Sequence, residues 1–340
     1  MSFFIPALFL SLFGVFTILG VRLDLFFNQA TYLLLAIFAY FFTKKFASLF
    51  RKNYIFFFWF SFFLLIITFI IGLESRGSKR WLSLYFFNLQ PSEILKVFFI
   101  IYFSFFLQKG SFYFEKIKIF LKSVIIFSTI VFLIFKQPDL GNTIVFAFIF
   151  FTLIFFSSIP KKIVFNFIII ILPLLPLSWF FLKDYQKQRI LSFLNPDFDY
   201  YGASYNMIQS IISVGSGGFF GRGLGYGTQS KLRFLPESHT DFAFASLVEQ
   251  FGFFGGLMVL ILYACLFYFL LKRAFFLLNQ KDKQEDFLIV IGALVYFFFQ
   301  MLINIGMNMG IFPITGIVLP FISYGGSALI SSFILLALIP

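Results

Sequence analysis

Three acidic residues stand near the start of apolar segments of this chain. Glu93 and Asp139 each follow a proline closely, and Asp241 follows the only histidine, His239. Proline suits a first helical turn and a carboxylate stabilises a helix N-terminus, so each acid has a structural explanation. A carboxylate can also act as a general base when a substrate hydroxyl lies within hydrogen-bond distance. Because it combines a helix start with a neighbouring histidine, Asp241 is our candidate for a catalytic base.

Two further charged residues lie inside apolar segments. Lys96 follows Glu93 by three residues, which places both side chains on one helical face. A lysine buried in a membrane helix is costly unless it is paired, so we expect a Glu93–Lys96 ion pair. A purely structural clamp explains this pair equally well. Glu249 is another acid within an apolar run, and the sequence identifies no partner for it.

The segment between Gly215 and Asp241 concentrates glycine and charge. Residues 215–227 are glycine-rich but follow no predicted strand, which argues against a nucleotide-binding loop. Glycines there could still let the backbone approach a diphosphate or act as a hinge. Lys231, Glu237 and His239 follow in one short stretch. No Ser-His-Asp spacing or HExxH motif accompanies the histidine, so a nucleophile triad or a zinc site is not indicated.

The composition indicates which kind of protein positions these residues. The chain of 340 residues is 61% hydrophobic and 12% charged, with a mean hydropathy of +0.98. A soluble surface needs about twice that share of charged residues. The net charge of +12 comes from basic clusters between apolar runs, a pattern of membrane topology and not of nucleic-acid binding. Cys265 is the single cysteine, which excludes intrachain disulfides and thiolate metal clusters.

Apolar runs of roughly 20 residues predict transmembrane helices. We expect an all-α polytopic membrane protein, one domain over residues 1–340, with a retained apolar first span. A β-barrel would instead show alternating segments of about ten residues. The ten expected spans are 3–20, 28–43, 54–73, 91–108, 117–135, 142–159, 162–182, 241–271, 287–310 and 319–339.

The distribution of basic residues predicts the orientation. Loops on one side hold 14 Lys and Arg residues, whereas the short loops on the other side hold five. Positive residues mark the cytoplasmic side, so we expect both termini in the cytoplasm. Residues 181–240 then form one long extracytoplasmic loop between the seventh and eighth helices, and Asp241 faces outward.

Motifs that occur in a fixed order give a resemblance to a known family. They cover about three quarters of the chain, and their number and order are highly specific. The motifs are Gly77-Ser78-Lys79-Arg80-Trp81, Gln90-Pro91-Ser92-Glu93-Ile94-Leu95-Lys96, Gln137-Pro138-Asp139-Leu140-Gly141, Asn195-Pro196-Asp197, Tyr205 to Ser210, Gly215 to Ser230, Leu235 to Phe242, Asn304 to Asn308 and Leu319 to Ser327. The chain resembles the SEDS family (shape, elongation, division and sporulation), and most of all its rod-shape branch, on residues 227–230 and Met307-Asn308.

The resemblance implies a function and roles for several residues. Members are peptidoglycan glycosyltransferases of the bacterial cytoplasmic membrane that polymerise lipid II at the outer leaflet. They work with a class B penicillin-binding transpeptidase and other membrane proteins of the elongation machinery. By motif, Asp241 matches an essential outer-loop aspartate. Glu93 and Lys96 match a fourth-helix pair, and Arg80 and Trp81 match a functional motif of the second outer loop.

The chemistry expected of such an enzyme is a single displacement. An acceptor 4-hydroxyl attacks a sugar carbon that carries an undecaprenyl diphosphate leaving group, and Asp241 takes the hydroxyl proton. The leaving diphosphate needs positive charge, and whether a divalent cation such as Mg²⁺ or Mn²⁺ assists is left open. Five basic residues are candidates for binding the diphosphate, and the sequence does not rank them: Arg80, Arg189, Arg222, Lys231 and Arg233.

Other functions remain as alternatives. A lipid II flippase should line a polar path across the whole bilayer, but the inner halves of the expected helices hold almost no polar groups. A scaffold for a transpeptidase would leave the acids at the helix starts with only a folding role. A division-type polymerase of the same family would share the chemistry. We therefore expect a polymerase.

Overall fold

Long apolar helices dominate the computed structural model, which describes residues 2–75, 78–84, 87–110, 112–174, 176–195, 202 and 204–340. Six of these helices are long and apolar enough to cross a membrane. They are α1 (Phe4–Val21), α2 (Leu23–Lys45), α4 (Tyr54–Ile71), α6 (Tyr113–Lys136), α12 (Ala243–Leu278) and α13 (Gln284–Asn308). The shorter helices of the bundle are α5 (Pro91–Phe106), α7 (Leu140–Phe156), α8 (Lys161–Ile171) and α14 (Gly326–Leu338). The prediction of an all-α bundle is thus confirmed.

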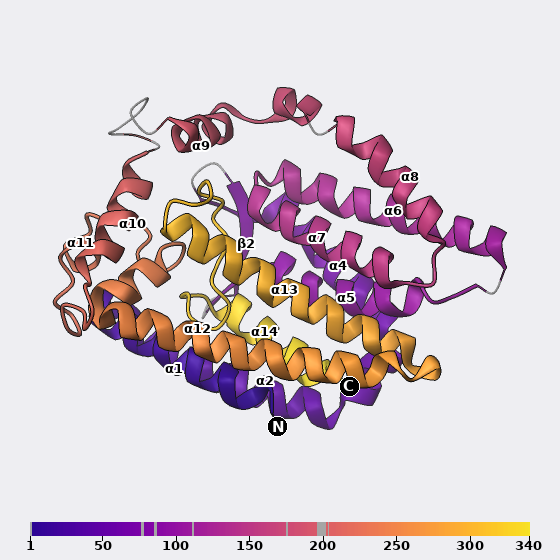
Figure 1. Ribbon diagram of the computed structural model, residues 1–340, viewed down its shortest axis with the longest axis horizontal. Coiled ribbons are helices and arrows are strands. Elements are labelled where there is room, and N and C mark those ends of the chain that lie inside the picture. The colour runs from indigo at the N-terminus through magenta and orange to yellow at the C-terminus, as the bar shows by residue number, and fades with distance from the viewer. Residues whose placement is uncertain are drawn as a thin grey trace.

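Figure 1 shows these helices side by side, with α13 in the middle of the bundle. Helix α13 packs against α5, α7 and α12, while α14 packs against α2 and α5. One connected cluster of buried apolar side chains joins these helices. Short helix α3 (Ala47–Lys52) and turn η4 (Lys281–Lys283) complete the end of the bundle away from α10.

Two expected spans differ in length from the observed helices. The seventh, expected at 162–182, is α-helical only to Ile171 and continues as 3₁₀ turns η1 (Leu172–Leu174) and η2 (Pro176–Phe181). Prolines 173 and 176 remove backbone donors there, which prevents a continuous α-helix. The tenth, expected at 319–339, begins at Gly326 because residues 311–325, with Pro313 and Pro320, form an irregular segment.

A small antiparallel sheet follows α4, although the sequence was interpreted there as a plain loop. Its order is β1 (Leu73–Ser75), β2 (Ser78–Leu84) and β3 (Phe87–Leu89). Strand β2 carries Arg80 and Trp81, and Trp81 is the register partner of Leu73. Gly77 of the first family motif lies outside the described residues. Because β3 leads directly into α5 through Gln90, the sheet brings Arg80 close to the first turn of α5.

About half of the described residues in the long loop expected at 181–240 are helical. It contains α9 (Asp184–Leu194), α10 (Tyr205–Ser216) and α11 (Thr228–Lys231). Figure 1 shows α10 and α11 at one end of the bundle, beside the start of α12. Pro196 and Asp197 of the fourth family motif lie outside the described residues.

The glycine-rich residues of this region pack into a break within α12. At Gly252 the backbone adopts φ 69° and ψ −165°, which interrupts the helix. The freed carbonyl of Glu249 accepts from Arg222 N at 2.9 Å, and that of Gln250 accepts from Gly223 N at 3.0 Å. A Cβ atom on Gly252 would lie 2.3 Å from Gly221 N, so only glycine allows this contact. The glycines therefore serve backbone packing here.

Candidate active site

Asp241 lies two residues before α12, and its backbone is held by α13. Its carbonyl oxygen accepts from Asn304 Nδ2 at 3.0 Å and from Asn308 Nδ2 at 3.1 Å. The Asn308 Oδ1 atom accepts from the backbone N–H of Ala245 at 3.0 Å, in the first turn of α12. The two asparagines are one helical turn apart and both fully buried. They fix the Asp241 backbone relative to the central helix of the bundle.

The irregular segment 311–325 covers Asp241 from a second direction. Tyr324 N donates to the His239 carbonyl at 2.8 Å, and Ser323 Oγ donates to the Thr240 carbonyl at 2.7 Å. Gly316 has φ 72°, and a Cβ atom there would lie 3.6 Å from Asp241 Oδ2. The segment therefore brings its backbone next to the Asp241 carboxylate.

Burial and the surrounding charges together set the pKa of the Asp241 carboxyl group. Burial is the largest effect, and together with the negative charge of Glu237 it raises the pKa of Asp241 to about 6. The guanidinium groups of Arg189 and Arg80 act in the opposite direction, and Asp139 adds a smaller upward effect. The side chain still keeps part of its surface accessible. A carboxylate with a pKa near neutrality is well suited to accept a proton at neutral pH.

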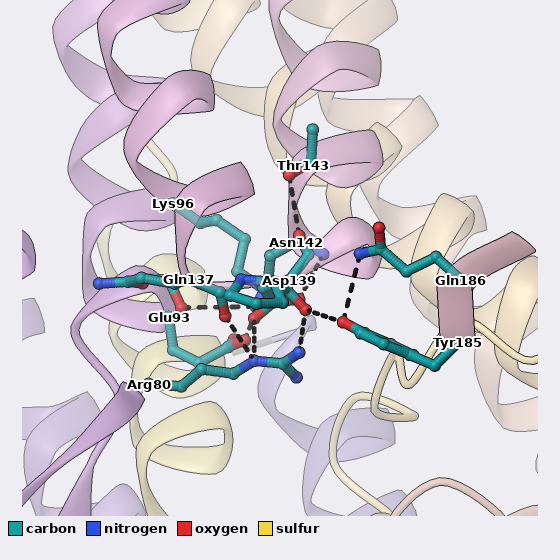
Figure 2. A network of polar contacts seen from close by, with 11 residues as sticks. Arg80, Glu93, Lys96, Gln137, Asp139, Asn142, Thr143, Tyr185 and Gln186 are labelled. Carbon is teal, nitrogen blue, oxygen red and sulfur yellow. Dashed lines mark hydrogen bonds and ion pairs between the residues drawn. The ribbon is translucent and has the colours of Figure 1, made fainter. Parts of the chain in front are cut away.

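Arg80 reaches from β2 to the start of α7. Its Nε donates to the Gln137 carbonyl at 3.2 Å and lies 3.8 Å from Asp139 Oδ2. Its Nη2 donates to the Pro138 carbonyl. Figure 2 shows the guanidinium lying among these acceptors. The loop before α7 thus orients Arg80, and Asp139 balances part of its charge.

The expected ion pair between Glu93 and Lys96 is present and extends to Arg80. Lys96 Nζ lies 2.7 Å from Glu93 Oε1 and donates to Asn142 Oδ1 at 2.9 Å. The Asn142 amide in turn donates to Asp139 Oδ2 at 2.9 Å. The Lys96 and Glu93 side chains are 0% and 3% exposed. A continuous polar chain therefore runs from the buried pair through α7 to Arg80 (Figure 2).

A cavity of about 100 Å³ opens beside Arg80. Tyr185 and Arg189 of α9 line it, and the Tyr185 hydroxyl donates to the Pro138 carbonyl at 3.1 Å. Arg189 Nη1 donates to the Ile314 carbonyl at 3.4 Å. The remaining lining residues are Pro138, Leu140, Ile144, Gln186, Ile190, Pro313, Ile314 and Thr315. Two guanidinium groups and an apolar wall thus meet in one cavity, and its lining residue Thr315 directly precedes Gly316.

The other three basic candidates for binding the diphosphate do not line this cavity. Arg222 donates to the Ser216 carbonyl at 3.2 Å and to Thr228 Oγ1 at 3.0 Å. Lys231 lies over the Tyr226 ring. Arg233 is exposed and adopts a left-handed backbone with φ 63°. Of the five basic candidates, the structure therefore places Arg80 and Arg189 in the cavity and the other three outside its lining.

Two of the remaining predicted residues, Glu237 and His239, lie just before Asp241, whereas Trp81 lies apart on β2. Glu237 has φ 53° and accepts from Thr240 Oγ1 at 2.9 Å, within the turn that leads to Asp241. The His239 ring lies 5.6 Å from the Tyr324 ring. Trp81 is partly exposed on β2 and is not part of the cavity lining.

Glu249 has a different environment, which the sequence did not reveal. It is fully buried, and its carboxylate accepts from Gln229 N at 2.8 Å, from Ser230 N at 3.0 Å and from Ser213 Oγ at 3.2 Å. Its partners are thus backbone and hydroxyl donors of α10 and α11. This acid fastens α10 and α11 to α12.

Several residues of the site were missed as individual candidates. Asn142 and Tyr185 carry no motif of their own, while Asp139 was interpreted mainly as a helix-start residue. The sequence did hold two signals for such residues. One is a polar Asn142 within an apolar helix, and the other is the i, i+4 spacing of Asn304 and Asn308. In the described ranges, no three His, Cys, Asp or Glu side chains form a metal-binding group. Mg²⁺ often binds through only one or two carboxylates together with substrate phosphates, so the absence of such a three-residue group from the described ranges does not decide whether Mg²⁺ takes part.

Comparison with known proteins places the chain in a family. A family model for cell cycle proteins, FtsW/RodA/SpoVE, matches residues 4–340. The peptidoglycan glycosyltransferase MrdB of Escherichia coli (strain K12) is 36% identical over 272 residues, which cover 78% of this chain and 71% of the relative. A probable peptidoglycan glycosyltransferase FtsW of Wigglesworthia glossinidia brevipalpis is 37% identical over 280 residues, covering 82% and 72%.

Solved structures share the fold. The crystal structure of the rod shape determining protein RodA of Thermus thermophilus superposes with a TM-score of 0.72 at 22% identity, covering 99% of this chain and 94% of that one. A chain of a peptidoglycan synthase complex that coordinates polymerisation and crosslinking gives 0.80 at 23% identity, covering 99% and 95%. The match over almost the whole chain and the identity to relatives lead to one conclusion: the chain belongs to the FtsW/RodA/SpoVE family of cell cycle proteins, the SEDS family.

Proposed function

We propose that this protein polymerises lipid II into glycan strands at the outer face of the cytoplasmic membrane, with Asp241 as the general base. Peptidoglycan glycosyltransferase is the activity named for its relatives, and membership of the family makes the chain an enzyme of this class. The observation that carries the residue assignment is the position of Asp241. Its pKa is raised to about 6, and Arg80 and Arg189 act on it electrostatically.

The reaction is a displacement at the anomeric carbon of the donor sugar. The bond between that carbon and the diphosphate oxygen breaks, and the diphosphate leaves with the electron pair. A new bond forms to the 4-oxygen of the acceptor sugar, whose proton passes to the Asp241 carboxylate. One displacement inverts the anomeric centre, so no covalent enzyme intermediate is needed.

The cavity between α7 and α9 suits the leaving diphosphate. Arg80 and Arg189 line it, and guanidinium groups bind phosphate oxygens through paired hydrogen bonds. Leu140, Ile144 and Ile190 form an apolar wall on which a prenyl chain can lie. Arg80 is oriented by the loop before α7, so its position does not depend on bound substrate.

The membrane orientation belongs to the same proposal. We place both termini in the bacterial cytoplasm, because the loops expected on the same side of the membrane as the termini hold 14 Lys and Arg residues. Single cysteines at Leu232 and Ser48, both exposed positions, test this in a Cys265→Ala background. An impermeant maleimide should label the Leu232→Cys variant in cells stripped of outer barriers and leave the Ser48→Cys variant unlabelled. The reverse pattern would contradict the orientation and the outward-facing site.

A class B penicillin-binding transpeptidase is the proposed partner, within the elongation machinery. Support comes from the similarity to a chain of a synthase complex that coordinates polymerisation and crosslinking. We favour cell elongation and shape maintenance on residues 227–230 and Met307-Asn308. Relatives named MrdB and FtsW have nearly equal identity to the chain, so a division role is the alternative.

A reconstituted assay tests the enzymatic proposal. Purified protein in detergent is given labelled lipid II, and glycan products are separated on a gel. We expect a ladder from the parent protein and none from Asp241→Asn. A flippase produces no polymer in detergent, so absence of any ladder from a folded parent protein would contradict the proposal. The assay is repeated after treatment with a chelator, and then again with Mg²⁺ or Mn²⁺ added back. The comparison decides whether a divalent cation takes part.

A further inference from the structure

The outer half of α2 has an unusual polar face. Asp24, Asn28 and Tyr32 follow one another at four-residue intervals, so their side chains share one side of the helix. Asn28 and Asp24 are exposed and Tyr32 is partly exposed. Below Tyr32 the helix is almost entirely apolar down to Thr43. Asn28 and Tyr32 fall within the expected span 28–43, where polar groups on a membrane helix are costly and usually line a path for a polar ligand, so this face calls for an occupant.

The segment that covers Asp241 forms the opposite wall. The Tyr324 and Tyr32 rings lie 5.9 Å apart, and the Tyr324 hydroxyl interacts with the side chains of Tyr32 and Asn28. Tyr324 also contacts His239, and Tyr32 lies 6.3 Å from the ring of Phe87 on β3. All of these aromatic side chains remain partly exposed. They form a strip that leads from α2 to within two residues of Asp241.

The charges along this strip are balanced. Arg22 Nε donates to Asp24 Oδ1 at 2.9 Å, and Arg22 also interacts electrostatically with Glu237. Arg233 acts on Asp24 in the same way. The cavity that contains Arg80 and Arg189 suits an anion, whereas this strip offers paired charges, an amide and aromatic rings. Such a surface suits an uncharged ligand rich in hydroxyl groups, whose C–H faces pack on rings and whose hydroxyls meet polar side chains.

We propose that this face of α2, with Tyr324 and His239, is a saccharide subsite that holds the acceptor sugar. The inference rests on the proposed function, in which Asp241 takes the acceptor's proton and the arginine cavity holds the donor's diphosphate. Thr315 of the cavity lining directly precedes Gly316, whose backbone lies next to the Asp241 carboxylate, and His239 of the strip lies two residues before Asp241. The two sugars thus approach the base from different elements.

A blocking substitution tests the subsite. Asn28→Trp places a bulky ring in the strip from an exposed position, and Leu34→Trp, also exposed and lower on α2, is the matched control. We expect Asn28→Trp to raise the KM for lipid II about tenfold or more and to shorten the glycan products. The Leu34→Trp variant should match the parent in KM and product length. An Asn28→Trp protein with parental KM and ladders would overturn the proposal.

A binding measurement keeps the test decisive if Asn28→Trp folds poorly. In a Cys265→Ala, Asp241→Asn background without turnover, maleimide alkylation of the purified protein is followed at Asn28→Cys and at the control Ser48→Cys, an exposed position remote from the strip. Lipid II alone should slow alkylation at position 28 several-fold and leave position 48 unchanged. Protection that requires a transpeptidase would make the strip a protein contact and overturn the saccharide subsite. Loss of polymerisation by the parent protein would contradict the proposed function instead, because protection does not depend on turnover.

Discussion

Asp241 and Glu249 are acids eight residues apart, one just before α12 and the other in its second turn, yet their surroundings differ sharply. Glu249 is fully buried, and its carboxylate is satisfied by two backbone N–H groups and the hydroxyl of Ser213. Asp241 is held by its backbone carbonyl, through Asn304 and Asn308, while its carboxylate is surrounded by charges. The protein therefore fixes the position of Asp241 without saturating its side chain.

This difference separates a structural acid from a reactive one. The oxygens of Glu249 already accept hydrogen bonds from the protein, so they are engaged in holding α10 and α11 against α12. For Asp241, burial and then the negative charge of Glu237 raise the pKa to about 6. An acid that is precisely positioned but poorly stabilised is what general-base catalysis requires. The comparison can be tested by substituting each acid in turn.

The largest effect is expected for Asp241→Asn. Removing a general base typically costs about 10²–10⁴ in rate, so the ladder should vanish. Because the raised pKa makes the charged native form less stable above about pH 6, the variant should melt at or above the parental temperature at pH 8. At pH 4, where Asp241 is protonated, the two should melt alike. An active Asp241→Asn protein would remove this residue from the mechanism.

The buried pair should give the next largest effect. Breaking a buried ion pair costs about 3–5 kcal/mol, so Glu93→Gln or Lys96→Met alone should lower the free energy of unfolding strongly. The double variant should recover much of that stability. We expect its activity to stay low, because Lys96 also holds Asn142 and, through Asp139, Arg80. Activity that returns together with stability would make the pair purely structural.

Asn142 offers a matched test of the same chain. Asn142→Leu leaves the Glu93–Lys96 pair intact and removes the link to Asp139. Its activity should fall like that of the double variant, with a stability loss of about 1–3 kcal/mol. Glycan ladders from equal amounts of folded protein measure this. Parental activity would show that Arg80 does not depend on the chain.

Glu249→Gln should affect stability more than chemistry. One of its two oxygens becomes an amide that faces the N–H of Gln229 or Ser230, which costs about 1–3 kcal/mol. Ser213→Ala, which removes only the third donor, is the milder control. Thermal unfolding should show the loss, and the rate per folded molecule should change little. A stable but inactive Glu249→Gln protein would contradict the division between the two acids.

Much of the fold follows from apolar run lengths, because a membrane leaves helices as the main solution. The runs predicted the positions of α1, α2, α4 and α6 to within a few residues. The sheet at 73–89 was missed because its strands are short and depend on contacts with α4 and α5. The late start of α14 was missed because a 20-residue apolar run does not show that its first part is irregular. Tertiary contacts decide both features.

The site was partly predictable for a similar reason. Local spacing was enough for the Glu93–Lys96 pair, which lies within one helical turn. Patterns in a single sequence could not rank the five basic candidates for the diphosphate. Only folding brings Arg80 of β2 and Arg189 of α9 to one cavity and places Arg222 beside α11. The partner of Glu249 was equally hidden, because backbone donors leave no trace in residue types.

The smallest expected effect concerns the pH dependence of polymerisation. Asp241 acts as a base only when deprotonated, so kcat/KM should rise with pH and reach half its maximum near the pKa of about 6. Arg189 lowers that pKa, so Arg189→Gln should move the midpoint to higher pH, whatever it does to the maximal rate. Glu237 raises it, so Glu237→Gln should move the midpoint to lower pH.

Opposite shifts from these two variants are hard to explain by lost structure, which lowers the rate at every pH alike. Arg222→Gln is the control, because Arg222 contacts Ser216 and Thr228 and not the Asp241 surroundings. Its midpoint should equal that of the parent. Initial rates with subsaturating lipid II between pH 5 and pH 8 measure all four proteins. Midpoints that coincide would show that a group other than Asp241 titrates, and the contrast between Asp241 and Glu249 would then rest on their positions alone.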